Sequence, residues 1–535
     1  MAALSPAARD TALATIPGAP LDLLVIGGGI TGAGIARDAA LRGLAVALVE
    51  AEDFGAGTSS RSSKLIHGGV RYLQQGDVAL VREAANERQV LRTLAPHLTE
   101  PVHMVIPTYG LATQTKLRAG LWAFERLTTV PPGEHYAMWS REEALAAEPL
   151  LAPERLYGAA AFVEYLTDDA RLVLANVCAA AAAGALVANH AEVTALRDGD
   201  VTVRDTLGGG TVRCRARVVV NAAGPWVQDV WRRAGVAGGR RLQLTKGIHL
   251  VVDHARLPLR HAVVMTARDK RSVFAIPRDG ISYLGTTDTF VPEPEREPGI
   301  DRDDVDYLLE AASRTFTGAP LAPRDVLGAW AGLRPLLAEA GKAPSEISRK
   351  DEIMVDPTSG LVSIAGGKLT TYRRMAERVV DIVVERLGRQ AGICRTAEVP
   401  LPGGERPAPS PGALMARIPA LGRDGAVRLV RLHGANAEVI AARACEGPAP
   451  VATIPGLPGV LRAEVEHVLD EEMALTLPDL LERRLRALTF DRHQGLGGVE
   501  AVAAIAAARL GWDAARTAAE IDGFRRLAAS LRSFA

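Results

Sequence analysis

The first residues whose types and spacing suggest chemistry are three glycines near the N-terminus. Gly27, Gly29 and Gly32 form a GxGxxG pattern directly after an apolar run and at the start of a helical pattern. In that setting the first glycine permits a tight turn, the second lets a pyrophosphate approach the backbone, and the third lets the helix pack on the strand. Glu50 ends the following apolar run, where a carboxylate can accept hydrogen bonds from both ribose hydroxyls. This combination predicts a dinucleotide site and argues against NADP.

Two later strand ends carry glycine turns that distinguish between the dinucleotides. They are Asn-Ala-Ala-Gly at 221–224 and Ser-Ile-Ala-Gly-Gly-Lys-Leu-Thr-Thr-Tyr at 363–372. A two-domain FAD fold needs a late strand–helix junction that returns to the flavin, whereas an NAD enzyme does not. A helix that starts near Lys368 would direct its positive end at the flavin pyrimidine and stabilise the anionic reduced form. The pattern therefore favours FAD. The cofactor contacts expected from the strands in this part of the fold are Val193, Ala223, Gly224, Gly366 and Gly367.

Cationic side chains accompany turns rather than exposed helix faces. The chain has only seven lysines among its 62 basic residues, and Lys64, Lys246 and Lys368 fall in loop-like segments. The arginines that share this setting are Arg71, Arg334 and Arg349. Several such groups suit a phosphate dianion, because arginine offers forked donors and lysine a compact charge. The clustering predicts a phosphorylated substrate.

Two interpretations of His67, which lies between Ser-Lys-Leu-Ile and Gly-Gly, stay open. It can act as an acid, a base or a group that shapes the flavin environment, or it can be a structural histidine. The sequence has no HExxH, P-loop, GxSxG or EF-hand pattern. Its four cysteines have no CxxC spacing. We therefore expect no metal site.

The composition limits the class of protein. The chain has 62 basic and 62 acidic residues, and 48% of its residues are hydrophobic. A neutral chain lacks the basic face that neutralises phosphates, so nucleic acid is not an expected partner. No apolar run reaches the roughly 20 residues needed to cross a bilayer, and residues 1–20 lack the pattern of a signal peptide. Unpaired cysteines fit a reducing compartment. These features favour a cytosolic protein with a frayed N-terminal tail.

Hydrophobic periodicity predicts the elements that position these residues. Residues 21–50 have the pattern of a β–α–β unit, whereas 242–290 alternate with period two as in an antiparallel sheet. Residues 396–413 are rich in Pro and Gly and predict a linker. The fold class expected is α/β, with an FAD-binding Rossmann-type domain, an interleaved mixed-sheet substrate domain and a helical C-terminal domain. The predicted boundaries are 1–20 for the tail, 21–395 for the oxidoreductase region, 396–413 for the linker and 414–535 for the helical domain. The FAD-binding segments are expected at about 21–75, 168–230 and 328–387, and the substrate-domain segments at about 76–167 and 231–327.

Together these segments resemble the FAD-dependent glycerol-3-phosphate dehydrogenases of the aerobic, quinone-linked type. The most specific strings are Thr-Ser-Ser-Arg-Ser-Ser-Lys-Leu-Ile-His-Gly-Gly-Val-Arg-Tyr-Leu at 58–73 and Gly-Gly-Lys-Leu-Thr-Thr-Tyr-Arg at 366–373. Further matching strings lie at 26–39, 168–176, 221–227, 269–277, 284–288 and 332–335, and a weaker one at 471–484. The resemblance implies oxidation of sn-glycerol 3-phosphate to dihydroxyacetone phosphate, with hydride passing from C2 to flavin N5. It also implies transfer of the electrons to a membrane quinone rather than to oxygen.

The same resemblance implies roles for individual residues. The substrate-binding residues would be Arg71, Tyr72, Arg334, Arg349, Lys368 and Thr370. The residues that it implies take part in catalysis are Arg334 and Lys368; His67 is added to them from its own sequence setting, as described above. The implied FAD contacts are Thr58, Ser59, Ser62, Ser63 and Lys64. Arg61 departs from the small residue that the family often has there, which could alter the cofactor loop.

Two other functions stay open on the residues alone. An amine or 2-hydroxy-acid oxidase would bind a carboxylate with about one arginine, and a non-catalytic redox sensor would not need the cations. A quinone is lipid-soluble, so the enzyme is expected at the inner face of the cytoplasmic membrane, in peripheral contact with lipid. The candidate surfaces are the basic segments Lys116–Arg126 and Arg483–Arg486, although each could be an ordinary solvated helix face. A homodimer is left open.

Overall fold

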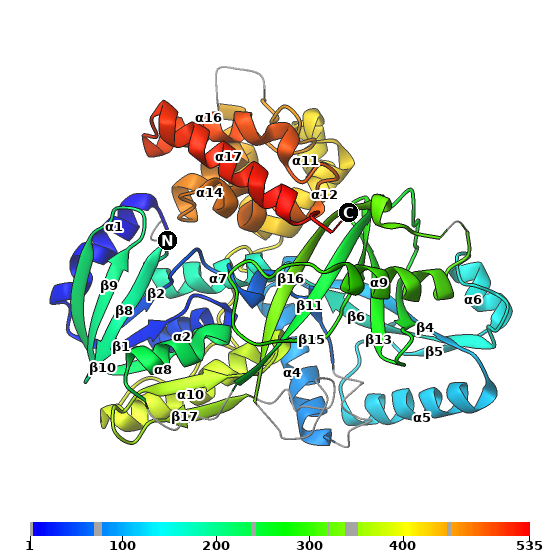
Figure 1. The fold of residues 1–535 in the computed structure, drawn as a ribbon, viewed down its shortest axis with the longest axis horizontal. Coiled ribbons are helices and arrows are strands. Elements are labelled where there is room, and N and C mark those ends of the chain that lie inside the picture. Colours follow the sequence, from blue (N-terminus) through cyan, green and yellow to red (C-terminus); the bar gives the residue numbers. More distant parts are fainter. Residues whose placement is uncertain are drawn as a thin grey trace.

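The computed structural model of the chain describes residues 4–68, 77–236, 242–318, 320–337, 351–446 and 451–534. The expected site residues Arg71, Tyr72 and Arg349 lie outside these ranges. Within the described ranges the strands form one sheet of eight and one sheet of ten. The C-terminal helices lie above both sheets (Figure 1). This architecture confirms the predicted α/β class with a helical C-terminal domain.

The eight-stranded sheet has a parallel centre that is buried on both faces. Strand β1 (Leu21–Ile26) pairs in parallel with β2 (Val46–Val49) and with β10 (Thr211–Asn221), and all six residues of β1 are buried. Such apolar strands are typical of a sheet covered by helices on both sides. The remaining strands are β7 (Leu186–Ala188), β8 (Ala191–Arg197), β9 (Asp200–Asp205), β17 (Glu352–Val355) and β18 (Val362–Ala365). The helices packed against this sheet are α2 (Ile30–Leu41), α7 (Asp169–Ala182), α8 (Val227–Arg233) and α10 (Tyr372–Leu387).

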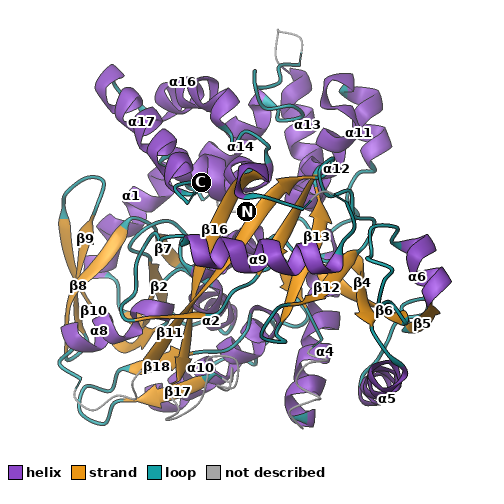
Figure 2. Cartoon of the chain, turned by 45° about the vertical axis from the view of Figure 1, so that its right-hand side comes forward, coloured by secondary structure: helices purple, strands orange, loops and turns teal. Residues whose placement is uncertain are grey.

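The ten-stranded sheet is mixed. Its longest pair is β11 (Leu242–Asp253) with β16 (Val326–Leu337), which run antiparallel, whereas β12 (Ala262–Thr266) and β4 (Glu100–Thr108) are parallel. The expected antiparallel region at 242–290 is therefore joined to earlier strands through one parallel pair. The other strands are β3 (Leu65–Ile66), β5 (Ala137–Ser140), β6 (Gly158–Leu166), β13 (Ser272–Arg278), β14 (Ile281–Gly285) and β15 (Thr289–Val291). The helices around this sheet are α4 (Val78–Leu94), α5 (Leu111–Leu127), α6 (Arg141–Ala147) and α9 (Arg302–Thr315) (Figure 2).

The chain passes between the two sheets four times. It builds the first sheet with residues 21–49, 186–221 and 352–365, and the second with residues 65–166 and 242–337. The two sheets are therefore interleaved in sequence, as expected. The strand ends that meet between them come from distant parts of the chain.

The C-terminal helices have a core of their own. Leu480 and Val499 are completely buried in one apolar cluster, and Leu429 and Ile440 in a second. The helices are α11 (Pro411–Arg417), α12 (Gly422–His433), α13 (Ala437–Glu446), α14 (Arg462–Glu471), the π-helical segment Asp479–Arg484, α15 (Ala487–Phe490), α16 (Val499–Leu510) and α17 (Ala514–Ser530).

The segment between α10 and α11 has no helix or strand, but it is held in place. The Arg37 guanidinium on α2 donates to the carbonyls of Thr396 and Val399. Leu401 is completely buried, and its N–H donates to the Leu94 carbonyl at 2.9 Å. Residues 388–410 therefore form a fixed strap across α2 and α4 rather than a loose connection.

The N-terminus differs from the frayed tail that its sequence suggested. Residues Pro6–Thr15 form α1, and the Ser5 hydroxyl caps it by accepting from the Ala8 N–H at 3.1 Å. Arg9 is 3% exposed and pairs with Asp205 at 2.6 Å. The Ser-Pro start was a helix signal, because serine is favoured at the N-cap and proline at the first helical position. The buried ion pair then fixes the helix against the β8–β9 hairpin.

Candidate active site

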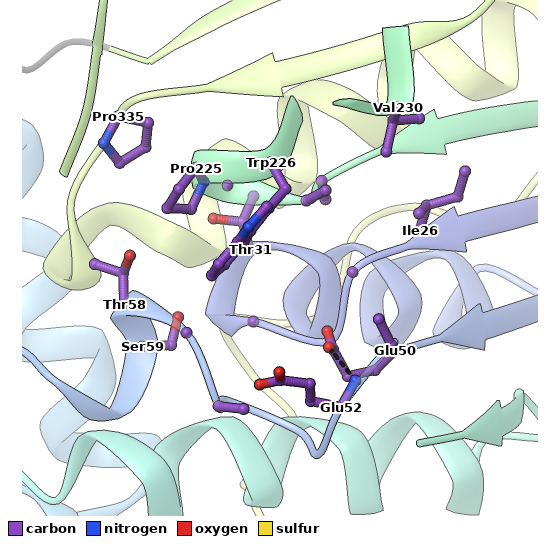
Figure 3. A pocket seen from close by; sticks show the side chains of 18 of the residues that line it. Ile26, Thr31, Glu50, Glu52, Thr58, Ser59, Pro225, Trp226, Val230 and Pro335 are labelled. Carbon is purple, nitrogen blue, oxygen red and sulfur yellow. Dashed lines mark hydrogen bonds between the residues drawn. The ribbon is translucent and has the colours of Figure 1, made fainter. Parts of the chain in front are cut away.

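A cavity of about 430 Å³ lies at the carboxyl ends of β1, β2, β10 and β18. Its walls come from five stretches of sequence, at 26–31, 49–62, 191–193, 222–233 and 366–369, with further residues near 294–296 and 335. Figure 3 shows Glu50 and Glu52 on one side of this space and Pro225 and Trp226 on another. Ligands of open α/β sheets bind at this end of the strands. The position of the cavity therefore matches that of a dinucleotide site.

The glycine turn leaves no room for side chains. A Cβ atom on Gly27, whose φ is +105°, would lie 2.7 Å from the Ala222 carbonyl oxygen. A Cβ on Gly32 would lie 1.9 Å from the Gly27 oxygen, so Gly32 does not line the cavity but lets α2 pack on the turn. Gly29 is the N-cap of α2 and does line the cavity. The first turn of α2 consequently presents its positive end to the space where a pyrophosphate would bind.

Glu50 is fixed at the end of β2. Its Oε2 accepts from the Gly28 N–H at 2.6 Å, and its Oε1 accepts from the Glu52 N–H at 2.9 Å. Burial raises the pKa of Glu50, while these two N–H groups act in the opposite direction. Each oxygen keeps a further lone pair, and the side chain lines the cavity. The carboxylate can therefore accept hydrogen bonds from a ribose, as the sequence predicted.

The loop at residues 51–64 forms one wall of the cavity. Thr58, Ser59 and Ser62 line this wall, as expected. The Ser59 hydroxyl accepts from the Ile30 N–H at 3.0 Å, and Thr58 donates to the Leu333 carbonyl at 2.5 Å. The 51–64 loop is thus tied to the start of α2 on one side and to β16 on the other.

The late glycine junction closes the opposite wall. Gly366 and Gly367 have φ values of +77° and +85°, which only glycine adopts without strain. Lys368 follows as the cap of a short 3₁₀ turn, Leu369–Thr371, and α10 begins only at Tyr372. The helix therefore starts later than expected, but its positive end still faces the cavity that Lys368 and Leu369 line. Val193, Ala223 and Gly224 complete the predicted lining.

Ser63 and Lys64 belong to the 51–64 loop but lie behind its cavity-facing side and do not line the cavity. The Lys64 ammonium is completely buried, 3.0 Å from Asp169 Oδ1 and 2.9 Å from the Ser60 carbonyl oxygen. Burial lowers its pKa to about 8, although Asp169 opposes that shift. Lys246 is also drawn into ion pairs, with Asp301 and Asp304. These two lysines belong to supporting contacts and not to the cavity lining.

Arg334 belongs to a polar cluster next to the cavity. Its neighbour Pro335 lines the cavity, and its own guanidinium donates to Asp288 Oδ1 at 3.1 Å and to the Thr286 hydroxyl at 2.9 Å. Gly247 on β11 makes room for it, because a Cβ there would lie 2.2 Å from Arg334 Nη2. Thr370 is buried, and its hydroxyl is 3.4 Å from the His67 carbonyl oxygen. Neither His67 nor Thr370 is among the residues that line the cavity.

His249 is a residue of this cluster that the sequence analysis missed. Its Nε2 is 2.8 Å from the Ser63 hydroxyl, and its ring stacks on Trp330 with centroids 4.8 Å apart. Burial, together with the charges of Lys64 and Arg334, holds the pKa of His249 well below its ordinary value. The ring is consequently neutral at pH 7. A signal was present, since His249 ends the same Lys-Gly-Ile-His string that carries Lys246.

One group of potential metal ligands occurs in the described part of the chain. His433, His467 and Glu472 have ligand atoms within 4.8 Å of one another, and all three are buried. Both oxygens of Glu472, however, already accept from the Arg171 guanidinium. Arg171 also lies 3.3 Å from His433 Nδ1. The arrangement is that of an ion pair between α7 and the C-terminal helices.

The cavity fits FAD by its shape and by the chemistry of its walls. The glycine turns leave space that side chains would fill, two helix starts face the same space, and Glu50 can accept from a ribose. FAD supplies all the matching groups: a ribose diol, a pyrophosphate and a flavin ring that the second helix start can stabilise.

Comparison with known families agrees with this reading of the cavity. The family described as FAD dependent oxidoreductase matches residues 22–373, and the family described as C-terminal domain of alpha-glycerophosphate oxidase matches residues 394–517. Together they cover the two sheets and most of the helical domain.

Similar proteins agree over the whole length of the chain. The aerobic glycerol-3-phosphate dehydrogenase of Bacillus subtilis is 40% identical over 528 residues, which is 94% of each chain. That of Staphylococcus aureus (strain MRSA252) is 45% identical over 397 residues, 72% of this chain and 71% of the relative. The crystal structure of the glycerol-3-phosphate dehydrogenase of Bacillus halodurans complexed with FAD is 36% identical, covers 99% of both chains and has a TM-score of 0.82. The chain is thus an FAD-dependent oxidoreductase and belongs to the family of the aerobic glycerol-3-phosphate dehydrogenases.

Proposed function

We propose that this protein oxidises sn-glycerol 3-phosphate to dihydroxyacetone phosphate and passes the electrons to a quinone. The observation that carries the proposal is that cationic side chains lie at the FAD-type cavity. Lys368 lines its wall, and Arg334 directly precedes Pro335, which also lines it. Bound FAD supplies a hydride acceptor at flavin N5. The names of the full-length relatives support the substrate.

The basic residues give the substrate its orientation. A phosphate dianion binds several charge-assisted donors, and Arg334 has a forked guanidinium whose position β11 and β16 fix. Lys368 adds a point charge at the cavity wall. We assign the two residues to the phosphate and to the C2 oxygen of the substrate.

The C2 hydroxyl must lose a proton when its hydride leaves. His67 was the candidate from sequence, and His249 is a second candidate by its position beside Arg334, although burial and the nearby cations lower its pKa and so make it a weaker base. Its contact with the Ser63 hydroxyl fixes the orientation of the ring. The variants His67→Asn and His249→Asn separate the two, since only the true acceptor should change the pH profile of flavin reduction.

The decisive experiment is anaerobic mixing of the purified protein with substrate while the flavin absorbance is followed. Glycerol 3-phosphate should bleach the flavin, whereas glycine, sarcosine and lactate should not. Bleaching by one of the latter three would favour an amine or 2-hydroxy-acid oxidase. No bleaching by any of them would leave a non-catalytic redox sensor.

The electron acceptor and the membrane are tested in the same preparation. After reduction, a quinone in lipid should reoxidise the flavin faster than oxygen does. Among the described residues, no helix is long and apolar enough to cross a bilayer. We therefore propose peripheral contact with lipid at the inner face of the cytoplasmic membrane. Rapid oxygen consumption with stoichiometric peroxide would contradict the quinone assignment.

A further inference from the structure

The 51–64 loop has two faces with different partners. One face lines the FAD cavity through residues such as Ala56, Thr58 and Ser62. The other face contacts residues 479–486 of the C-terminal helical domain, which we call the clamp segment. The clamp segment consists of the π-helical segment Asp479–Arg484 followed by Leu485 and Arg486. A single layer of backbone therefore separates the helical domain from the cofactor site.

Asp53 makes the first contact between these two parts. It is completely buried, and its carboxylate accepts from Arg483 Nε at 2.6 Å and from Arg484 Nη2 at 2.9 Å. The ring of the next residue, Phe54, packs so closely on Gly28 that a Cβ atom on Gly28 would lie only 2.7 Å from it. The Gly55 N–H also donates to the Gly28 carbonyl at 3.0 Å. The two arginines consequently act on the glycine turn through Asp53.

Arg61 makes the second contact from the loop side. It is 7% exposed, its Nη2 lies 2.6 Å from Glu297 Oε1, and its Nε lies 3.8 Å from Glu482 Oε1 of the clamp segment. Its Nη1 donates to the Arg296 carbonyl at 2.7 Å, and Arg296 itself lines the cavity.

Arg486 makes the third contact through a short relay. It donates to Asp168 Oδ2 at 2.9 Å and to Asp169 Oδ1 at 3.2 Å. Asp169 Oδ2 in turn accepts from the hydroxyl of Ser62 at 2.8 Å and from its N–H at 3.1 Å. Ser62 lines the cavity. Arg486 is thus two hydrogen bonds away from a cofactor-facing residue.

Apart from the Arg61–Glu297 pair, in which the Glu297 side chain is half exposed, these contacts are between buried charges. Asp53, Asp169 and Arg484 have no exposed surface, and Arg486 is 2% exposed. Removing one partner of a buried ion pair leaves an uncompensated charge, which is strongly destabilising. The contacts with the clamp segment therefore add to those that hold the loop against α2 and β16.

We propose that the C-terminal helical domain acts as a clamp that holds the 51–64 loop in its FAD-binding conformation. Asp53, Arg61, Arg484 and Arg486 are positioning residues in this proposal, because they act on FAD through the loop. Binding of FAD and docking of the clamp segment must then favour each other by the same factor. The inference requires only that the protein binds FAD and is independent of its substrate.

The first test is the rate at which FAD leaves the holoenzyme after dilution, followed by the fluorescence of the released flavin. Asp53→Asn should speed release by about 10-fold or more, because the buried Arg484 loses its carboxylate partner and Arg483 keeps only Asp479 and Glu482. Asp53→Glu should restore part of the retention. The readout needs no substrate, so it is independent of the proposed reaction.

Matched controls separate the clamp from general loss of stability. Glu472→Gln removes a buried pair with Arg171, which also joins the helical domain to α7 but does not touch the loop. Arg443→Gln removes ion pairs with Glu466 and Asp470 inside the helical domain, neither of which belongs to the clamp segment. Both should lower the melting temperature with little change in FAD release. Equal acceleration of release by Asp53→Asn and Glu472→Gln would overturn the proposal.

A second test uses the unaltered protein and does not depend on the folding of any variant. Hydrogen exchange is compared in the holoenzyme and after FAD has been removed. FAD should slow exchange in residues 479–486, while α13, which packs on α12 and α14 within the helical domain, serves as the internal reference. Protection confined to the cavity walls, with 479–486 unchanged, would show that the clamp is not coupled to the cofactor.

Discussion

Glu50 is the clearest single residue by which FAD binding can be weakened. Its carboxylate faces the cavity while two backbone N–H groups hold it. Glu50→Ala should weaken FAD binding by about 1.5–3 kcal/mol, because charge-assisted hydrogen bonds to the ribose are lost. The measurement is a titration of the FAD-free protein with FAD. Glu52→Ala is the matched control, since Glu52 lies on the same wall but pairs with Arg296 at 2.8 Å. Equal affinities of the Glu50 variant and the parent protein would rule out this role.

Arg334 and Lys368 should matter for the substrate rather than for FAD. Arg334→Ala and Lys368→Ala are each expected to lower kcat/KM for glycerol 3-phosphate by roughly 100-fold or more, because the phosphate loses charge-assisted contacts. Arg314→Ala is the control, since Arg314 is an exposed arginine in an i,i+4 pair with Glu310. Near-normal kinetics in either site variant would remove that residue from the site. Equal turnover of glycerol and of glycerol 3-phosphate would show that the site does not recognise the phosphate group.

At the scale of single elements, α5 is the helix that we expect to contact lipid. Leu111 and Trp122 are 64% and 55% exposed, Lys116 and Arg118 are also exposed, and Arg126 lies over the Trp122 ring at 5.3 Å. Apolar side chains rimmed by cations are typical of helices that lie in a membrane interface. The other expected surface, Arg483–Arg486, is buried against the 51–64 loop and is therefore excluded as a lipid contact.

The prediction for α5 is a loss of lipid binding without a loss of the fold. Trp122→Ala should reduce co-sedimentation with anionic vesicles several-fold, and high salt should release the parent protein, because both apolar and charged contacts contribute. Val439→Ala on α13 is the control, since Val439 is 49% exposed in the helical domain. Equal sedimentation of all three proteins would move the membrane contact away from α5.

The turn between β7 and β8 carries a pH-dependent contact to the clamp segment. His190 Nε2 is 3.0 Å from Asp479 Oδ2, and Asp53 and Arg483 are its other charged neighbours. Burial lowers the pKa of His190, but Asp479 outweighs this, with help from Asp53, so the pKa is raised. The contact then contributes its full stability below the unfolded pKa of about 6.5 and loses it as the pH rises through the higher folded pKa.

The melting temperature of the parent protein should therefore fall as the pH rises through the raised pKa of His190. A loss of 1 kcal/mol corresponds to about 2–4 °C for a large domain. The His190→Gln variant should have a lower melting temperature at low pH and should not show the fall as the pH rises. His135→Gln removes an exposed histidine that pairs with Glu125, and this variant should keep the fall. A step of the same size in the His190 variant would assign the pH dependence to another group.

At the scale of the whole molecule, the features that depend on neighbouring residues could be predicted from the sequence. The features that depend on contacts between distant residues could not. The glycine turns and Glu50 could be placed from sequence because each depends on a strand, a turn and a helix that are neighbours in the chain. Lys64 and the arginines of the clamp segment could not, since their carboxylate partners Asp53, Asp168 and Asp169 are separated from them by between 105 and 431 residues. An arginine-rich helix looks solvated until the acidic residues that bury it are known. His249 was missed for the same reason, because its neighbours come from the 51–64 loop (Ser63) and from β16 (Trp330 and Arg334).

The interleaved path of the chain also orders events during protein synthesis. The walls of the cavity extend from residue 26 to residue 369, and the clamp segment follows only at 479–486. A nascent chain released from the ribosome before residue 372 lacks one wall, and one released before residue 486 lacks the contacts behind the 51–64 loop. We therefore expect flavin loading to be a late, largely post-translational event. Premature termination anywhere before the last fifty residues should yield fragments that hold no cofactor.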